Sequence, residues 1–149
     1  MNIKPILVSF ILTALIGCSD KYSRVDDEKF VGTWRLEGRS MFDGITIEIA
    51  RNDNGELIGR IQKLNDNKYI QMFANIGDTW VSDISRNSNF QFRMTEKKIA
   101  RELFGLYGLS SSTEFKVEFI NENTIGLSTG GDPTESSVRY VRKDETQAD

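Results

Sequence analysis

Few side chains in this chain are of a type that does chemistry. The 149 residues include no histidine and a single cysteine, Cys18. Because histidine is the commonest acid–base group and the commonest metal ligand, its absence argues against zinc and copper sites and against most proton-transfer catalysis. Ser128 lies in a Gly-x-Ser-x-Gly pattern over residues 126–130, but no histidine is present to activate it. We therefore predict that the protein is not an enzyme and holds no metal and no cofactor.

The charged residues restrict the kinds of partner. The 19 basic and 22 acidic residues give a formal net charge of −3. A mildly acidic surface argues against nucleic acid as a partner, because phosphates require basic patches. It also argues against electrostatic docking on anionic lipid. The carboxylates follow no pattern that would place a catalytic pair across a cleft.

Residues 1–17 have the composition of an export signal. One basic residue, Lys4, precedes an apolar run from Ile6 to Ile16 that only Ser9 and Thr13 interrupt. The run is too short to span a bilayer as a permanent helix, whereas a charged start followed by an apolar middle is typical of a secretory signal peptide. We expect this segment to be removed from the mature protein.

The end of this segment, Leu15-Ile16-Gly17-Cys18, resembles the bacterial lipobox. The resemblance implies that Cys18 is lipidated, with acyl chains such as palmitate, and becomes the mature N-terminus at a membrane. The next residue is Ser19, where an Asp would resemble an inner-membrane retention signal. A lipid-anchored protein of the bacterial cell envelope is therefore expected, in the outer membrane and facing the periplasm or the cell surface. The alternative is an ordinary cleaved signal with an incidental cysteine.

A polar and charged segment, residues 18–29, follows the signal and includes the acidic triplet Asp26-Asp27-Glu28. Its composition predicts a short flexible tether whose acidic side chains are solvated. A calcium site is not expected, because no defined loop supplies further oxygen ligands.

From residue 30 onward, apolar residues alternate with polar ones, which is typical of half-buried β-strands. A strong hairpin turn is expected at Asn52–Gly55, because Asn-Gly supplies positive φ angles. We expect strands over residues 32–38, 45–50, 57–61, 69–73, 79–84, 90–95, 114–119, 124–129 and 136–142. Residues 98–109 fit either an irregular strand or a short helix. The domain is predicted to span residues 30–143, and residues 144–149 to form a disordered tail.

About eight to ten short antiparallel strands joined by tight turns imply an all-β domain, either a closed barrel or a sandwich. The run Phe30-Val31-Gly32-Thr33-Trp34 resembles the opening of the lipocalin, fatty-acid-binding and avidin-like barrels, together called calycins. The resemblance implies a lipocalin-like up-and-down barrel in which Trp34 closes one end beneath an arginine of the last strand. We expect that arginine to be Arg142, with Gly32 allowing a close backbone approach. The alternative is that Trp34 is an ordinary core residue.

The inward-facing side chains favour a binding protein. The candidate ligand contacts are Phe90, Phe92, Met94, Phe115, Phe119 and Tyr140. Such side chains either line an apolar cavity or fill the barrel. Two functions therefore stay open. One is an envelope lipoprotein that binds a small, largely apolar ligand. The other is a filled barrel that acts on a protein partner as an inhibitor, immunity factor or envelope assembly factor.

Overall fold

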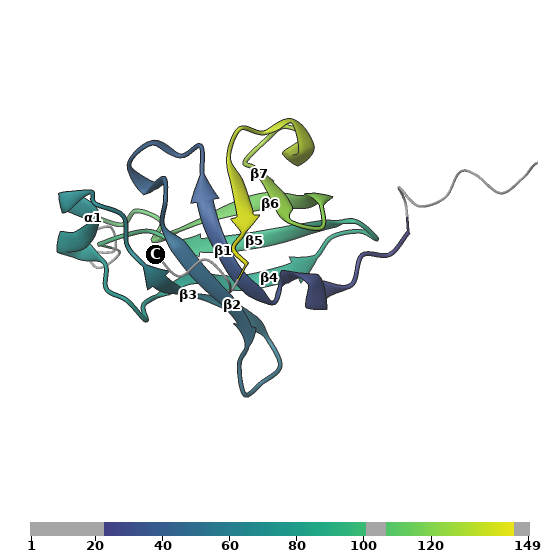
Figure 1. The fold of residues 1–149 in the computed structure, drawn as a ribbon, viewed down its shortest axis with the longest axis horizontal. Coiled ribbons are helices and arrows are strands. Elements are labelled where there is room, and N and C mark those ends of the chain that lie inside the picture. The colour runs from purple at the N-terminus through teal and green to yellow at the C-terminus, as the bar shows by residue number, and fades with distance from the viewer. Residues whose placement is uncertain (1–22, 101–106, 145–149) are drawn as a thin grey trace, which may run out of the picture.

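The computed structural model describes residues 23–100 and 107–144, which form a closed barrel of eight antiparallel strands (Figure 1). Each strand is hydrogen-bonded to the next one along the chain, and the last strand returns to the first. The strands are β1 (Gly32–Glu37), β2 (Thr46–Arg51), β3 (Leu57–Lys63), β4 (Thr79–Arg86), β5 (Gln91–Lys97), β6 (Ser112–Asn121), β7 (Thr124–Ser128) and β8 (Arg139–Arg142). The predicted all-β, up-and-down antiparallel barrel is thereby confirmed. The expected signal peptide, Cys18 and residues 145–149 lie outside the described residues.

Alternation along the strands builds the core, as β5 shows. Phe92 and Met94 are buried, whereas Arg93 between them is exposed. Met94 pairs with Phe115 of β6, which is also buried. Since successive residues of a strand point to opposite faces, the same alternation turns Glu96 inward, where it is buried too. A carboxylate therefore ends an otherwise apolar stripe inside the barrel.

The turn between β2 and β3 is the predicted hairpin. The Asn52 side chain accepts hydrogen bonds from the backbone N–H groups of Asn54, at 3.0 Å, and Glu56, at 2.9 Å. Gly55 has a φ angle of 79°, a left-handed conformation that glycine adopts without a steric penalty. Local turn chemistry alone explains this hairpin, and the prediction is confirmed.

Residues 69–73 were expected to form a strand, and this prediction is wrong: they lie in the helix α1 (Lys68–Phe73). The Asn67 side chain accepts hydrogen bonds from the backbone N–H groups of Tyr69 and Ile70, which caps the first helical turn. Of the helix residues, Ile70 is the buried one. A short apolar run is compatible with a strand or with a single amphipathic turn, and here the cap decides in favour of the helix.

The remaining described segments are short. The part of the chain that the structure describes includes three 3-10 helices: η2 (Asp27–Phe30), η3 (Ser40–Phe42) and η4 (Pro133–Glu135). Residues 98–100 and 107–109, predicted as an irregular strand or a short helix, belong to neither. Residues 101–106 between them lie outside the described part of the chain.

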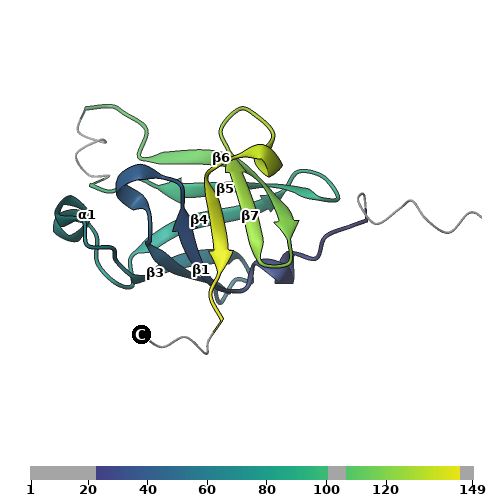
Figure 2. The same cartoon turned by 45° about the horizontal axis from the view of Figure 1, so that its top comes forward.

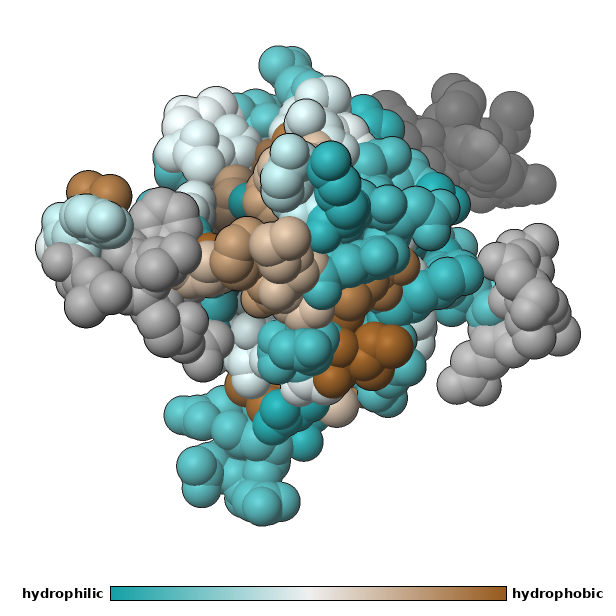
Figure 3. Space-filling model, turned by 90° about the vertical axis from the view of Figure 1, so that its left-hand side faces the viewer, coloured by the Kyte–Doolittle hydropathy of each residue, from teal (hydrophilic) through white to brown (hydrophobic). Residues whose placement is uncertain are grey.

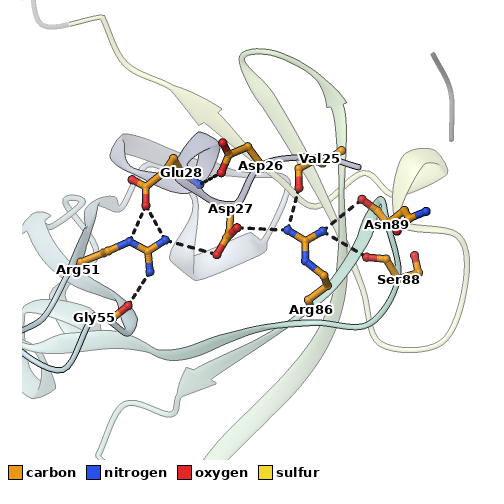
Figure 4. Close-up of polar contacts among 9 residues, drawn as sticks. All are labelled: Val25, Asp26, Asp27, Glu28, Arg51, Gly55, Arg86, Ser88 and Asn89. Atoms are coloured by element: carbon orange, nitrogen blue, oxygen red, sulfur yellow. Dashed lines mark hydrogen bonds and ion pairs between the residues drawn. The ribbon is translucent and has the colours of Figure 1, made fainter. Parts of the chain in front are cut away.

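The described part of the expected tether packs against the barrel instead of extending into solvent (Figure 4). Arg51 donates to Glu28 at 2.5 Å and contacts Asp27 at 3.4 Å. Arg86 donates to Asp27 at 3.2 Å and to the backbone carbonyl of Val25 at 2.8 Å. We call these four charged side chains the clasp. The acidic triplet stays largely exposed, and two of its members also pair with arginines of β2 and β4.

The two ends of the barrel carry different elements. Figures 1 and 2 show the purple N-terminal segment at one end and α1 at the other. We call the first the closed end, which holds Phe30, Trp34 and Arg142. We call the second the open end, which is formed by α1, the β1–β2 connection and the end of β5.

Candidate functional site at the open end of the barrel

The closed end contains the residues that the opening motif singled out. Trp34 is fully buried, and its indole N–H donates to the backbone carbonyl of Phe30 at 2.7 Å. The Arg142 guanidinium lies 4.2 Å from the Trp34 ring centroid, which suits a cation–π contact. It also donates to the backbone carbonyls of Val31, at 3.0 Å, and Lys29, at 2.6 Å. The structure therefore places Arg142 over Trp34, with Trp34 and Arg142 paired between β1 and β8.

Gly32 makes room for this arrangement. A Cβ atom at this position would lie 2.5 Å from an Arg142 guanidinium nitrogen, and the φ angle of 134° is one that other residues rarely adopt. Around it, the Phe30 ring lies 4.8 Å from the rings of both Phe92 and Phe119. Aromatic rings therefore pack against one another at this end of the barrel.

Five of the six predicted ligand contacts pack in the barrel core, and Phe90 is the exception. Phe92 and Phe119 belong to the packing of the closed end, and Met94 is fully buried in the core. Phe90 is partly exposed and precedes β5. Phe115 and Tyr140 lie nearer the open end, but they border its polar groups and not the cavity itself. The structure therefore moves the candidate site to residues that the strand pattern did not single out.

A cavity of about 790 Å³ lies at the open end. Its walls come from the β1–β2 connection, α1, the start of β4, the end of β5 and the start of β6. The apolar side chains on these walls include Met41, Phe42, Ile70, Phe73, Trp80 and Ile99. Figure 3 faces this end of the molecule and shows apolar residues gathered on it. Several large apolar side chains at this end are exposed, among them Met41, Tyr69, Phe73, Tyr107 and Leu109.

A hydrogen-bonded group of polar side chains lies at the base of this cavity. The Tyr140 hydroxyl donates to one Glu96 oxygen at 2.5 Å and accepts a hydrogen bond from the Trp80 indole N–H at 2.8 Å. Arg39 donates to the other Glu96 oxygen and forms an ion pair with it. Glu96, Trp80 and Arg39 line the cavity, and Tyr140 lies behind them. We call these four residues the polar floor.

Arg39 is held on three sides. Its guanidinium carbon lies 5.0 Å from the ring centroid of Phe42 and 5.0 Å from that of Phe115, and its N–H group binds Glu96. Its side chain keeps 24% of its surface exposed, whereas the Glu96 side chain keeps 2%. A guanidinium fixed by stacking and by an ion pair loses little further freedom when it binds a ligand.

Burial of the Tyr140 hydroxyl raises its pKa well above the ordinary value, and the neighbouring Glu96 carboxylate raises it further. The phenol therefore keeps its proton at neutral pH and serves as a hydrogen-bond donor to Glu96. This arrangement holds the carboxylate in one orientation. The polar floor can bind and orient a ligand atom, which is the chemistry that its geometry supports.

Sequence reasoning missed Arg39, Trp80 and Glu96 as site residues. Glu96 did carry a signal, because it continues the inward-facing series of Phe92 and Met94 with a charged residue. A buried carboxylate needs a partner, which could have prompted a search for one. Arg39 carried no comparable signal, because it lies in a connection between strands.

Other kinds of site find no support in the described ranges. Within residues 23–100 and 107–144, no group of three or more Cys, Asp or Glu side chains could hold a metal ion. No helix in this part of the chain is long and apolar enough to cross a bilayer. Comparisons with protein-family models, with curated proteins and with solved structures found no match to this chain.

Proposed function

We propose that the protein is a lipid-anchored envelope protein whose lipocalin-like barrel binds a small, largely apolar ligand at its open end. The observation that carries this proposal is the cavity of about 790 Å³ with apolar walls and few polar groups. Ligand sites in proteins typically measure roughly 300–1,000 Å³ and combine apolar walls with a small number of placed polar groups. The polar floor supplies such groups, and the protein acts by binding and not by catalysis.

The anchor is supported by the sequence Leu15-Ile16-Gly17-Cys18 and its resemblance to a lipobox. The chain enters the barrel at the closed end, where the clasp holds residues 25–28 (Figure 4). The described chain therefore joins the barrel at the closed end, and the cavity lies at the opposite end.

Binding is tested with a pair of substitutions on neighbouring residues of β6. Thr113 lines the cavity, whereas Glu114 is exposed on the outer face. Thr113→Phe places a ring in the cavity, and Glu114→Phe adds the same ring outside the barrel. The assay follows decanol binding to the Cys18→Ser form of the full chain, purified without detergent, by the fluorescence of Trp80 on the cavity wall.

We expect Thr113→Phe to weaken decanol binding by at least about tenfold, which corresponds to the loss of one or two methylene contacts. Glu114→Phe should leave it unchanged. The proposal would be contradicted if decanol showed no saturable binding to the unsubstituted cavity and mass spectrometry detected no lipid in protein purified from membranes.

A second candidate function is a protein-interaction module, such as an inhibitor, immunity factor or envelope assembly factor. It is favoured by the exposed side chains Tyr69, Met72 and Ile76 on and after α1, which are 54%, 69% and 69% exposed. Exposed apolar groups clustered at one end of a domain often mark a binding surface. Met72→Ser should abolish such a contact while leaving decanol binding intact, because Met72 does not line the cavity.

A further inference from the structure

We propose that the ligand carries an uncharged polar end that accepts hydrogen bonds, as an alcohol, ester or amide oxygen does, and that Arg39 binds this end while Glu96 disfavours free carboxylates. This inference rests on the proposed function and adds the chemical class of the ligand's polar end. It follows from the composition of the polar floor, where one cation is already matched by one anion.

Arg39 is the donor that a ligand meets in the cavity. Its guanidinium is stacked between the rings of Phe42 and Phe115 and is tied to Glu96. A guanidinium has several N–H groups in a fixed planar fork and no acceptor. Among the described residues, the ion pair with Glu96 engages one nitrogen of the guanidinium, which leaves other N–H groups for an acceptor atom in the cavity. A ligand oxygen next to Arg39 therefore receives preorganised hydrogen bonds.

Glu96 determines which kinds of hydrogen-bond acceptor on a ligand can bind next to Arg39. Its side chain is 2% exposed, and its two oxygens accept hydrogen bonds from Tyr140 and Arg39. A ligand carboxylate bound to Arg39 would be a second anion beside the buried Glu96, and the two would share one guanidinium, because Lys97 and Lys98 on the cavity wall are partly exposed. Like charges in such a setting repel strongly. A neutral oxygen uses the same donors without this repulsion.

Cationic ligands are disfavoured for a different reason. An ammonium group has no acceptor to offer Arg39 and meets its positive charge. Lys97 and Lys98 also line the cavity and add positive charge, although both are partly exposed, where water and salt weaken their influence. The expected order of affinity is therefore neutral first, carboxylate second and ammonium last.

The test compares three probes that share one alkyl chain: decanol, decanoate and decyltrimethylammonium. Each is titrated below its micellar concentration into the Cys18→Ser form of the full chain at pH 7.5. We expect the affinity for decanol to exceed that for decanoate by on the order of tenfold or more, because decanoate brings a like charge next to the buried carboxylate of Glu96. The ammonium probe should bind most weakly.

Glu96→Gln is the variant that isolates the charge, because glutamine retains hydrogen-bonding groups for Tyr140 and Arg39. We expect the affinity for decanoate, relative to that for decanol, to rise in this variant by on the order of tenfold. If Glu96→Gln does not fold, Arg39→Met replaces it. That variant keeps an apolar stem but removes the donors and leaves Glu96 unmatched, so decanol binding should weaken and decanoate binding should become undetectable.

The outcomes separate this inference from the function on which it rests. Decanoate binding as tightly as decanol to the unsubstituted cavity would overturn the inference while leaving apolar-ligand binding in place. An equal response of decanol and decanoate to Glu96→Gln would overturn it as well. Failure of all three probes to bind would instead reject the proposed function.

Discussion

The two ends of this barrel are built from the same alternating strands, yet one is filled and the other is hollow. At the closed end, Phe30, Trp34 and Phe119 pack ring against ring, and Arg142 covers the indole. At the open end, the inward positions of β5 and β8 carry Glu96 and Tyr140, which form hydrogen bonds in place of apolar packing.

The difference shows that the inward-facing residues of such strands can end either in packed aromatic rings or in a buried polar group. Aromatic rings have the bulk to close the narrow end of a barrel, and their packing requires no fixed partner atoms. A buried carboxylate needs hydrogen-bond donors at fixed positions, and side chains from other elements supply them. The carboxylate and these side chains together form a polar layer across the interior. Above that layer, α1 and the neighbouring connections enclose a cavity instead of filling it.

Removal of the tryptophan at the closed end should have the largest effect on stability. Trp34→Ala should lower the free energy of unfolding by about 3–5 kcal/mol, because a fully buried large aromatic leaves a cavity behind. Denaturant unfolding followed by circular dichroism measures this loss. A loss below about 1 kcal/mol would show that the end is not held by this residue.

Arg142→Ala is the matched variant at the same end. It should cost about 1–2 kcal/mol, through the lost stacking and the unpaired carbonyls of Val31 and Lys29. The two losses should not add in the double variant, since either change removes the shared contact. Decanol binding to Arg142→Ala should equal that of the unsubstituted chain, because the cavity lies at the other end. Strict additivity would argue that Arg142 does not act on Trp34.

A substitution in the polar floor should have the next largest effect on stability, and this effect should depend on pH. Tyr140→Phe removes the donor to Glu96 and the acceptor for Trp80 in a buried setting, so it should cost about 1–3 kcal/mol. Since burial raises the pKa of Tyr140 in the folded state, the unfolded chain loses this phenol proton at a lower pH. The contribution is thus fully present below pH about 10 and is lost as the pH rises above it.

Unfolding titrations between pH 8 and about 11 test this dependence, and the chosen range brackets the ordinary tyrosine pKa. Stability should decline more steeply in the unsubstituted chain than in Tyr140→Phe. Tyr107→Phe serves as the control, because that side chain is 79% exposed and should have no effect. Parallel curves for the unsubstituted chain and Tyr140→Phe would contradict the assignment of Tyr140 to a buried network.

The clasp should give the smallest effect. Asp27 keeps 47% of its side chain exposed, so Asp27→Asn should cost less than about 1 kcal/mol. A backbone hydrogen bond, followed by bonds from Arg51 and Arg86, holds the pKa of Asp27 below its ordinary value. Its contribution is therefore present above pH about 4 and is lost as the pH falls through the folded-state pKa.

Thermal unfolding between pH 2 and 7 at low salt measures this contribution over the range in which carboxylates titrate, roughly pH 2–5. Asp53→Asn, in the exposed turn after β2, removes the same charge without a clasp contact and should have a smaller effect. If the two variants showed the same pH dependence, the clasp would contribute nothing specific.

The strand pattern of the sequence was enough to predict an all-β domain, and the resemblance of its opening to calycins favoured the barrel and its closed end over a sandwich. Strand alternation and the Asn52–Gly55 turn are properties of single segments. Gly32 and Trp34 lie near the start of the domain and Arg142 near its end, and the up-and-down topology brings these two ends together. Short-range patterns carry such information because turn geometry and side-chain period are local properties of the backbone.

The open end depends on contacts between residues that are far apart in the sequence. Arg39 and Glu96 are separated by 57 positions, and Trp80 and Tyr140 by 60, so no local pattern links them. The Asn67 cap determines that residues 69–73 form the helix α1 and not a strand. The packing of the inward side chains against one another determines whether they fill the barrel or line a cavity. The physical reason is that a buried charge is stabilised by whichever donors the fold brings to it, and strand register, not sequence spacing, sets which side chains those are.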